Sequence, residues 1–166
     1  MKEETLKKLM KIYLTLRKFW DPIIVPDDLT PYRVSAEEFS RAINAMEYKQ
    51  DKINGLIDRT EDPNTFFDES KESDRDCDDW AREWSIWGNV NNCKATEWVI
   101  CSNTSVINAI NTMHVICTLE QNGRYWLCNY EMYGPFNSEE EALDYMKWFP
   151  SYMEERVTVK YRDIEF

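Results

Sequence analysis

The dipeptide Asn122-Gly123 is the feature that most constrains how this chain can fold. It stands between two runs of strand-forming residues, 113–120 and 124–130. Asn-Gly is the preferred pair for a two-residue β-turn, because both central residues of that turn need a positive φ that Asn and Gly tolerate. The sequence therefore predicts an antiparallel hairpin, and the short turn determines which residues face each other across it.

The register of this hairpin brings His114 close to Asn129. Counting outward from a two-residue turn sets Ile116 opposite Asn129. Side chains alternate along a strand, so His114 shares a face with Ile116 and has Asn129 as its diagonal neighbour. Diagonal partners lie roughly 7–8 Å apart at the backbone, a distance that His and Asn side chains can span with a hydrogen bond. The sequence predicts that Asn129 orients the imidazole of His114.

Two amino-terminal segments have the apolar spacing of helices. The first covers residues 6–20 and ends at Asp21-Pro22. Its predicted packing face consists of Leu6, Leu9, Met10, Tyr13, Leu16 and Trp20. The second opens with a capping box at residues 35–38 and is predicted to continue to about Asp58. We expect both helices to cover one side of the sheet.

A third helix is predicted to begin at Cys77 and to stop at Gly88-Asn89, after a charged loop at residues 59–76. The loop contains two aromatic residues that we expect to anchor it in the core, Phe66 and Phe67. The apolar positions of the helix recur with a period near 3.6: Trp80, Ala81, Trp84 and Trp87. This spacing predicts that the helix packs on the sheet along its length.

The remaining elements complete an α+β pattern. A short strand is predicted at residues 98–101, and an Asn- and Ser-rich stretch at 90–111 resembles an insertion. A capping box at Ser138 predicts a helix to about Trp148, closed by Pro150, and alternating apolar residues at 157–161 predict a final strand. The predicted fold class is α+β, with a largely antiparallel sheet.

Length and composition indicate one domain over residues 1–166, with residues 1–34 packed on it. No run approaches the roughly 18 apolar residues of a membrane span, and lysines and glutamates interrupt any apolar stretch near the start. The five cysteines show no paired spacing, so we expect free thiols in a reducing compartment, including Cys117 and Cys128 opposite each other in the hairpin. These features predict a cytoplasmic protein without a membrane partner.

The formal net charge of −11 makes nucleic acid an unexpected ligand, because a phosphate backbone is repelled unless a local patch reverses the sign. Acidity most often serves solubility. It also suits a second interpretation, in which the chain is a non-catalytic acidic protein of phage or mobile-element origin that binds a basic surface or acts as an inhibitor.

The candidate nucleophile is Cys77. A cysteine in the first turn of a helix lies near unpaired backbone N–H groups and the positive end of the helix dipole, which favour a thiolate. Four aspartates surround it and act in the opposite direction: Asp74, Asp76, Asp78 and Asp79. His114 is the one histidine of the chain, so it is the candidate base for any Cys–His chemistry.

Three blocks in this order resemble the transglutaminase-like cysteine proteinases of bacteria and phages: Asp76 to Ala81, Met113-His114-Val115, and Leu127-Cys128-Asn129. The resemblance spans about residues 35–148. It implies a papain/transglutaminase-type core in which Cys77 is the nucleophile, His114 the base and Asn129 the residue that orients the base. Arg75, where the family commonly has Gly, and Asn129, where it more often has Asp, depart from the pattern.

The implied activity is attack of Cys77 on an amide of a protein or peptide substrate, followed by transfer of the acyl group to water or to an amine, without a cofactor. The sequence does not distinguish these two acceptors. The stretch that starts at Asp74 also resembles the opening of a calcium loop, but Asp79 stands where that loop needs Gly and Ser85 where it needs a bidentate Glu. A zinc site is not expected, because the single histidine has no suitably spaced metal-binding neighbour.

Overall fold

The computed structural model describes residues 1–49, 60, 62–68, 75–149 and 156–166, and these form an α+β fold around one five-stranded sheet. All strand pairs are antiparallel, in the order β4-β3-β2-β1-β5. The strands are β1 (Lys94–Ser102), β2 (His114–Gln121), β3 (Arg124–Asn129), β4 (Glu131–Phe136) and β5 (Arg156–Ile164). The α-helices are α1 (Glu3–Arg17), α2 (Ala36–Asn44), α3 (Cys77–Val90), α4 (Val106–Asn111) and α5 (Glu139–Asp144). Short 3₁₀ helices cover Thr30–Tyr32, Pro63–Thr65 and Tyr145–Trp148.

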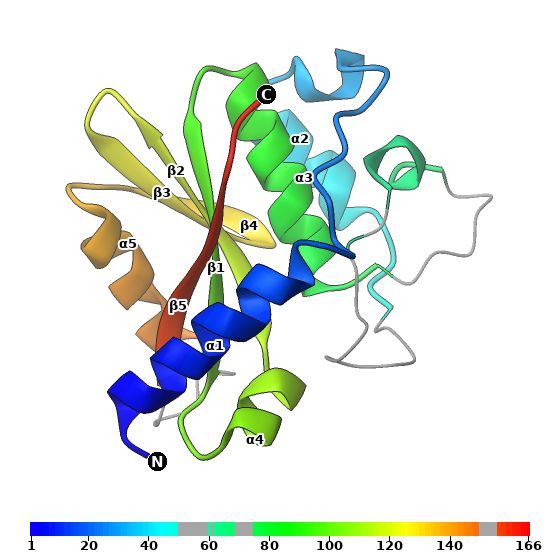
Figure 1. Ribbon diagram of the computed structural model, residues 1–166. Coiled ribbons are helices and arrows are strands. Elements are labelled where there is room, and N and C mark those ends of the chain that lie inside the picture. The colour runs from blue at the N-terminus through cyan, green and yellow to red at the C-terminus, as the bar shows by residue number, and fades with distance from the viewer. Residues whose placement is uncertain (50–59, 61, 69–74, 150–155) are drawn as a thin grey trace.

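Helices cover both faces of the sheet (Figure 1). On one face α3 packs across β1 and β2, and α1 lies along β5. On the other face α5 and the 3₁₀ turn after it pack on a smaller apolar cluster that includes Ile100, Ile116 and Leu127. Side chains alternate between the two faces along each strand, so Val115, Cys117 and Leu119 of β2 lie on the side covered by α3. The core is therefore layered, with the sheet in the middle.

The predicted third helix is confirmed and forms the centre of the larger core. Trp80, Ala81, Trp84 and Trp87 are all buried, and α3 continues through the predicted stop at Gly88-Asn89 to Val90. Ser85 faces the sheet and donates a hydrogen bond to the sulfur of Cys117 at 3.2 Å. α3 is therefore held against β2 along its length, which determines where its first residue, Cys77, can lie.

The first helix packs on the core through part of the predicted face. Leu6 and Met10 are buried as predicted, together with Leu14, whereas Leu9 is 39% exposed and Leu16 is 50% exposed. The prediction was wrong for Leu9 and Leu16, because α1 has apolar residues on two sides and spacing alone does not tell which side meets the sheet. The buried side of α1 also contains Arg17.

The second helix begins at its capping box, where Ser35 accepts from the Glu38 N–H, but it ends at Asn44. It does not continue through Tyr48 and Lys49 as predicted, because the Lys49 N–H donates to the Arg75 carbonyl at 2.7 Å and this segment runs beside the start of α3. The rest of the predicted helix lies outside the described residues. In the loop before α3, the expected anchors are placed as predicted, with Phe66 buried and Phe67 half-buried.

The predicted hairpin has the expected register. Gln121 pairs with Arg124 and Cys117 with Cys128, and both turn residues have positive φ, 53° at Asn122 and 73° at Gly123. The free thiols predicted at Cys117 and Cys128 are confirmed, as both are buried without a disulfide. Within the described ranges, no helix combines the length and apolar character that crossing a membrane requires.

Two elements were not predicted. α4 is a six-residue helix inside the Asn- and Ser-rich stretch, too short for a helical period to show in the sequence. β4 is an edge strand that contains Gly134-Pro135, and proline within a strand is tolerated mainly at a sheet edge. Residues 131–136, for which no strand was predicted, therefore belong to the sheet.

Candidate active site

Cys77 is the first residue of α3, and the residue before it caps the helix. The carboxylate of Asp76 accepts from the Asp78 N–H at 3.3 Å, and the carboxylate of Asp79 accepts from the Asp76 N–H at 2.8 Å. This reciprocal pattern is a capping box, which determines where the helix starts. It therefore sets the backbone position of Cys77 as well.

The aspartates around Cys77 have partners of their own. Asp78 accepts from Arg17 Nη2 at 2.8 Å and from Thr60 Oγ1 at 3.1 Å, so its charge is balanced on the side toward α1. Asp76 and Asp79 accept backbone N–H groups of the capping box. Asp74 lies outside the described residues. The crowding of negative charge expected from the sequence is therefore offset by a buried cation and by cap hydrogen bonds.

The sulfur of Cys77 lies beside the first residues of β2. The Val115 N–H donates to Cys77 Sγ at 3.5 Å. Because Val115 directly follows His114, this contact brings the thiol next to the backbone that carries the candidate base. The packing of α3 on β2 thus brings Cys77 into contact with Val115, which is 38 positions away in the chain.

The predicted contact between His114 and Asn129 is present. Nε2 of His114 lies 2.7 Å from Oδ1 of Asn129. Oδ1 only accepts hydrogen bonds, so Nε2 carries the hydrogen in this pair. In the neutral imidazole Nδ1 is then the unprotonated nitrogen, able to accept a proton. Nδ1 makes no hydrogen bond with the residues that the structure describes.

The surroundings of His114 favour its neutral form. Burial lowers the pKa of His114 below the ordinary 6.5, and the nearby positive charge of Arg156 acts in the same direction. The hydrogen bond to Asn129 raises the pKa but does not outweigh burial. A neutral imidazole at neutral pH is the state that a general base requires.

Tyr130 is a site residue that the sequence did not reveal. It directly follows Asn129 and has a φ of 63°, the left-handed region that non-glycine residues seldom occupy. Its carbonyl accepts from the indole Nε1 of Trp84 at 3.0 Å, and its ring lies 5.9 Å from the His114 ring. Trp84 on α3 therefore holds Tyr130 against the base. No sequence signal marks a single residue in this conformation.

Tyr48, Trp80 and Tyr130 form an aromatic wall near Cys77. Tyr48 lies 6.1 Å from the rings of both Trp80 and Tyr130, and Trp80 lies 5.9 Å from Tyr130. Burial first, and then the negative charge of a Cys77 thiolate, raise the pKa of Tyr48 to about 12, and the same two causes raise the pKa of Tyr130. The two phenols are therefore within electrostatic range of the thiol and keep their protons at neutral pH.

The acidic residues around Cys77 are poorly suited to binding a metal ion. One donor atom each of Asp76, Cys77 and Asp78 lie within 4.8 Å of one another. However, Asp76 caps the helix and Asp78 is bonded to Arg17, so both carboxylates are already used. The donor set is better explained by helix capping and ion pairing than by metal binding.

The structure also contains a buried ionic cluster that was not predicted from the sequence. Asp21 lies at its centre and accepts from Tyr161 and Arg162, while Arg82 forms two hydrogen bonds with Glu97, at 2.7 and 3.2 Å. A register shift in the β1–β5 pairing lets the consecutive residues Tyr161 and Arg162 both reach Asp21. The signal in the sequence was weak, because charged residues on a predicted helix are usually exposed.

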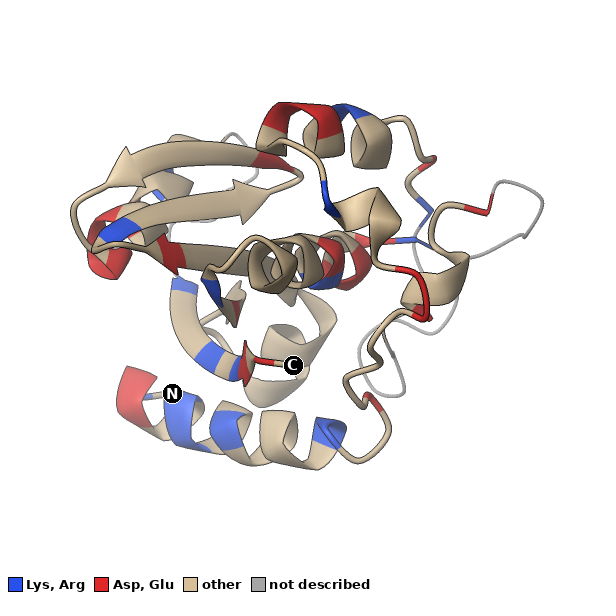
Figure 2. Cartoon of the chain, turned by 90° about the horizontal axis from the view of Figure 1, so that it is seen from above, with Lys and Arg blue, Asp and Glu red and all other residues tan. Residues whose placement is uncertain are grey.

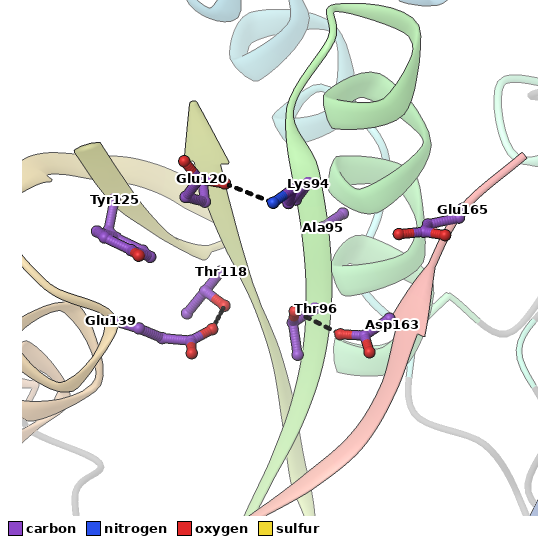
Figure 3. A pocket seen from close by; sticks show the side chains of 9 residues that line it. All are labelled: Lys94, Ala95, Thr96, Thr118, Glu120, Tyr125, Glu139, Asp163 and Glu165. Atoms are coloured by element: carbon purple, nitrogen blue, oxygen red, sulfur yellow. Dashed lines mark hydrogen bonds and ion pairs between the residues drawn. The ribbon is translucent and has the colours of Figure 1, made fainter. Parts of the chain in front are cut away.

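A separate cavity of about 320 Å³ lies on the sheet near the hairpin turn (Figure 3). Lys94 and Glu120 pair there, whereas His114 pairs with Ile100 at the opposite end of the β1–β2 ladder. Its carboxylates have local partners, since Glu139 accepts from Thr118 at 2.8 Å and Asp163 from Thr96 at 3.0 Å. This cavity is therefore distant from the candidate chemistry.

Comparison with models of known protein families found no match for this chain, and searches among curated proteins and among solved structures found none either. The geometry around Cys77, His114 and Asn129 is therefore the basis for proposing a function.

Proposed function

We propose that the protein is a cysteine-dependent hydrolase or acyltransferase of the papain/transglutaminase type, acting on an amide of a protein or peptide. The observation that carries this proposal is the 2.7 Å contact between His114 Nε2 and Asn129 Oδ1, with the Cys77 sulfur beside the backbone of the same strand. A helix-start thiol, an imidazole and an amide that orients it are the three components of nucleophilic catalysis by cysteine.

In the proposed mechanism Asn129 keeps the hydrogen of His114 on Nε2. Nδ1 takes the proton of the Cys77 thiol as the sulfur attacks the substrate carbonyl, which forms a C–S bond and a tetrahedral oxyanion. The imidazolium then gives its proton to the leaving amine as the C–N bond breaks, and a thioester remains on Cys77. The Cys77 backbone N–H is our candidate for one donor to the oxyanion.

The second half of the reaction regenerates the thiol. His114 removes a proton from water or from an amine, this acceptor attacks the thioester carbonyl, and the proton returns to the departing sulfur. With water the net reaction is hydrolysis, and with a lysine amine it is transamidation. The contact between Nδ1 and the thiol that both halves require is part of the proposal, since catalytic hydrogen bonds often shorten only when substrate binds.

Competitive alkylation of the thiols tests the proposal. Cys93 is a matched control, because it is half-buried like Cys77 and burial raises the pKa of its thiol. Limited iodoacetamide treatment near neutral pH, followed by peptide mapping, should label Cys77 before Cys93, and His114→Ala should slow labelling at Cys77 alone. Faster labelling of Cys93 in the folded protein would contradict the proposal and favour the non-catalytic acidic binding protein.

A further inference from the structure

The outward side of α1 carries an apolar stripe that the fold leaves exposed. Its members recur at spacings of three and four residues along the helix and into the turn after it: Leu9, Ile12, Leu16 and Phe19. Their exposures are 39%, 59%, 50% and 83%. The inward side of the same helix is already filled by Leu6, Met10 and Leu14, so the core does not account for the stripe. Contiguous exposed apolar side chains of this kind commonly mark an interaction surface.

The same helix reverses the charge of the protein locally. Without the buried Arg17, residues 1–20 contain five basic and two acidic residues, a net of +3, while the whole chain has a net charge of −11. In Figure 2, basic positions recur along α1 and its acidic positions are confined to the first turn. Lys8, Lys11 and Lys18 are exposed and form no ion pair with the described residues. These lysines are therefore available to an anionic partner.

A basic groove continues this surface onto the sheet. It measures about 570 Å³ and lies between α1 and β5, where Lys11, Lys18 and Lys160 contribute to its lining. Lys160 is paired with Asp163 at 2.9 Å, and Arg162, which also lines the groove, is paired with Asp21. Lys11 and Lys18 are therefore the main positive charges of the groove. Charge and apolar area thus occur together on one helix of an otherwise acidic molecule.

We propose that α1 docks the protein on the surface of an anionic lipid bilayer. The stripe of Leu9, Ile12, Leu16 and Phe19 enters the interface while Lys8, Lys11 and Lys18 lie near the phosphate groups, the arrangement of an interfacial amphipathic helix. This inference is independent of the function proposed for Cys77. It replaces the expectation of no membrane partner, which depended on the lack of a membrane-spanning segment, because surface docking requires no such segment. Acidic residues farther than about 8 Å from the bilayer are largely screened at physiological salt, so the net charge does not prevent docking.

A bilayer suits this surface better than a second copy of the chain. In a two-fold pairing through α1, the mid-helix residues Lys8 and Lys11 of one copy would lie near those of the other, and like charges repel. A bilayer of anionic lipid instead offers an apolar layer next to negative headgroups, and matches both properties of the helix.

Co-sedimentation of the full chain with lipid vesicles tests the inference. Vesicles of phosphatidylcholine with about one-third phosphatidylserine should bind the protein, and pure phosphatidylcholine vesicles should bind it far more weakly. Ile12→Ser combined with Phe19→Ser should lower binding about tenfold or more, because the apolar contribution is lost. Lys8→Gln combined with Lys11→Gln should weaken binding only to the anionic vesicles.

The chain offers a matched control in Ile107 and Trp148, which are 72% and 81% exposed and belong to α4 and to the 3₁₀ helix after α5 rather than to α1. Ile107→Ser with Trp148→Ser should leave vesicle binding unchanged, and all variants should keep the melting temperature of the parent, since the substituted side chains are exposed. Absence of binding, or equal loss in the control, would overturn the inference. A dimer in sedimentation velocity that the Ile12/Phe19 variant dissociates, without vesicle binding, would assign the stripe to self-association.

Discussion

Arg17 and Asp78 form a buried ion pair, with Nη2 2.8 Å from Oδ2, that joins the end of α1 to the first turn of the helix carrying Cys77. The two residues are 61 positions apart, and their side chains are 0% and 4% exposed. The pair therefore links a carboxylate next to the candidate nucleophile to a cation from another element.

Arg17→Met should be strongly destabilising. The substitution keeps most of the side-chain volume but leaves Asp78 as a buried carboxylate without its cation, a change that typically costs about 3–5 kcal/mol. Urea denaturation followed by tryptophan fluorescence measures this loss. Arg41→Met is the control, because Arg41 is 71% exposed in a 4.0 Å ion pair, and it should change the free energy of unfolding by less than about 0.5 kcal/mol. Equal effects of the two substitutions would show that the buried pair does not stabilise the fold.

Asn129 and His114 should act as one unit. An amide that holds the imidazole matters only when the imidazole is present, so the effects of the two substitutions should be strongly non-additive. Asn129→Ala should slow alkylation of Cys77 about tenfold or more near neutral pH, and should add little once His114 is Ala. Asn129→Asp should retain more reactivity than Asn129→Ala, because a carboxylate can accept the same ring N–H. Unchanged reactivity in Asn129→Ala would show that this residue does not orient the base.

His114 should titrate below 6.5, because burial lowers its pKa in the folded protein. The unfolded chain then binds the proton first as the pH falls, so this residue's contribution to stability is complete above pH 6.5 and is lost below it. A single histidine gives a single C2–H resonance, and its NMR titration measures the pKa directly. Asn129→Ala should lower the pKa further, since the hydrogen bond to Asn129 raises it. A pKa above 6.5 would contradict the buried, neutral imidazole.

Glu83 should retain its proton at neutral pH. Burial raises its pKa to about 8, against the hydrogen bond from the Tyr32 hydroxyl at 2.7 Å and the charge of Arg82, which both lower it. The native state then binds more protons than the unfolded state between pH 4.5 and 8, so the contribution to stability is complete below pH 4.5 and is lost as the pH rises through 8.

Glu83→Gln mimics the protonated carboxyl and can still accept from Tyr32. The variant should exceed the parent in free energy of unfolding at pH 9 by about 1 kcal/mol or more, and the difference should shrink toward pH 5. Urea denaturation at the two pH values measures this, with exposed Glu37→Gln as the control. A constant difference between Glu83→Gln and the parent at both pH values would show that Glu83 is ionised in the native state.

Local sequence chemistry was sufficient for several parts of the site. The Asn122-Gly123 turn determined the hairpin register and with it the proximity of His114 and Asn129, because strand alternation leaves no freedom once the turn length is known. The spacing of the tryptophans after Cys77 likewise indicated which side α3 buries. These features depend on residues close together in the chain, so short-range rules apply to them.

Only the tertiary structure decided the rest. The pairing of Arg17 with Asp78, the side of α1 that is buried and the position of Val115 beside the Cys77 sulfur all join elements that are far apart in the sequence. The left-handed backbone of Tyr130 is likewise maintained from a distance, by the indole of Trp84 on another element. Such contacts depend on which faces of two elements pack together. The spacing of apolar residues within one element contains no information about the element against which it packs.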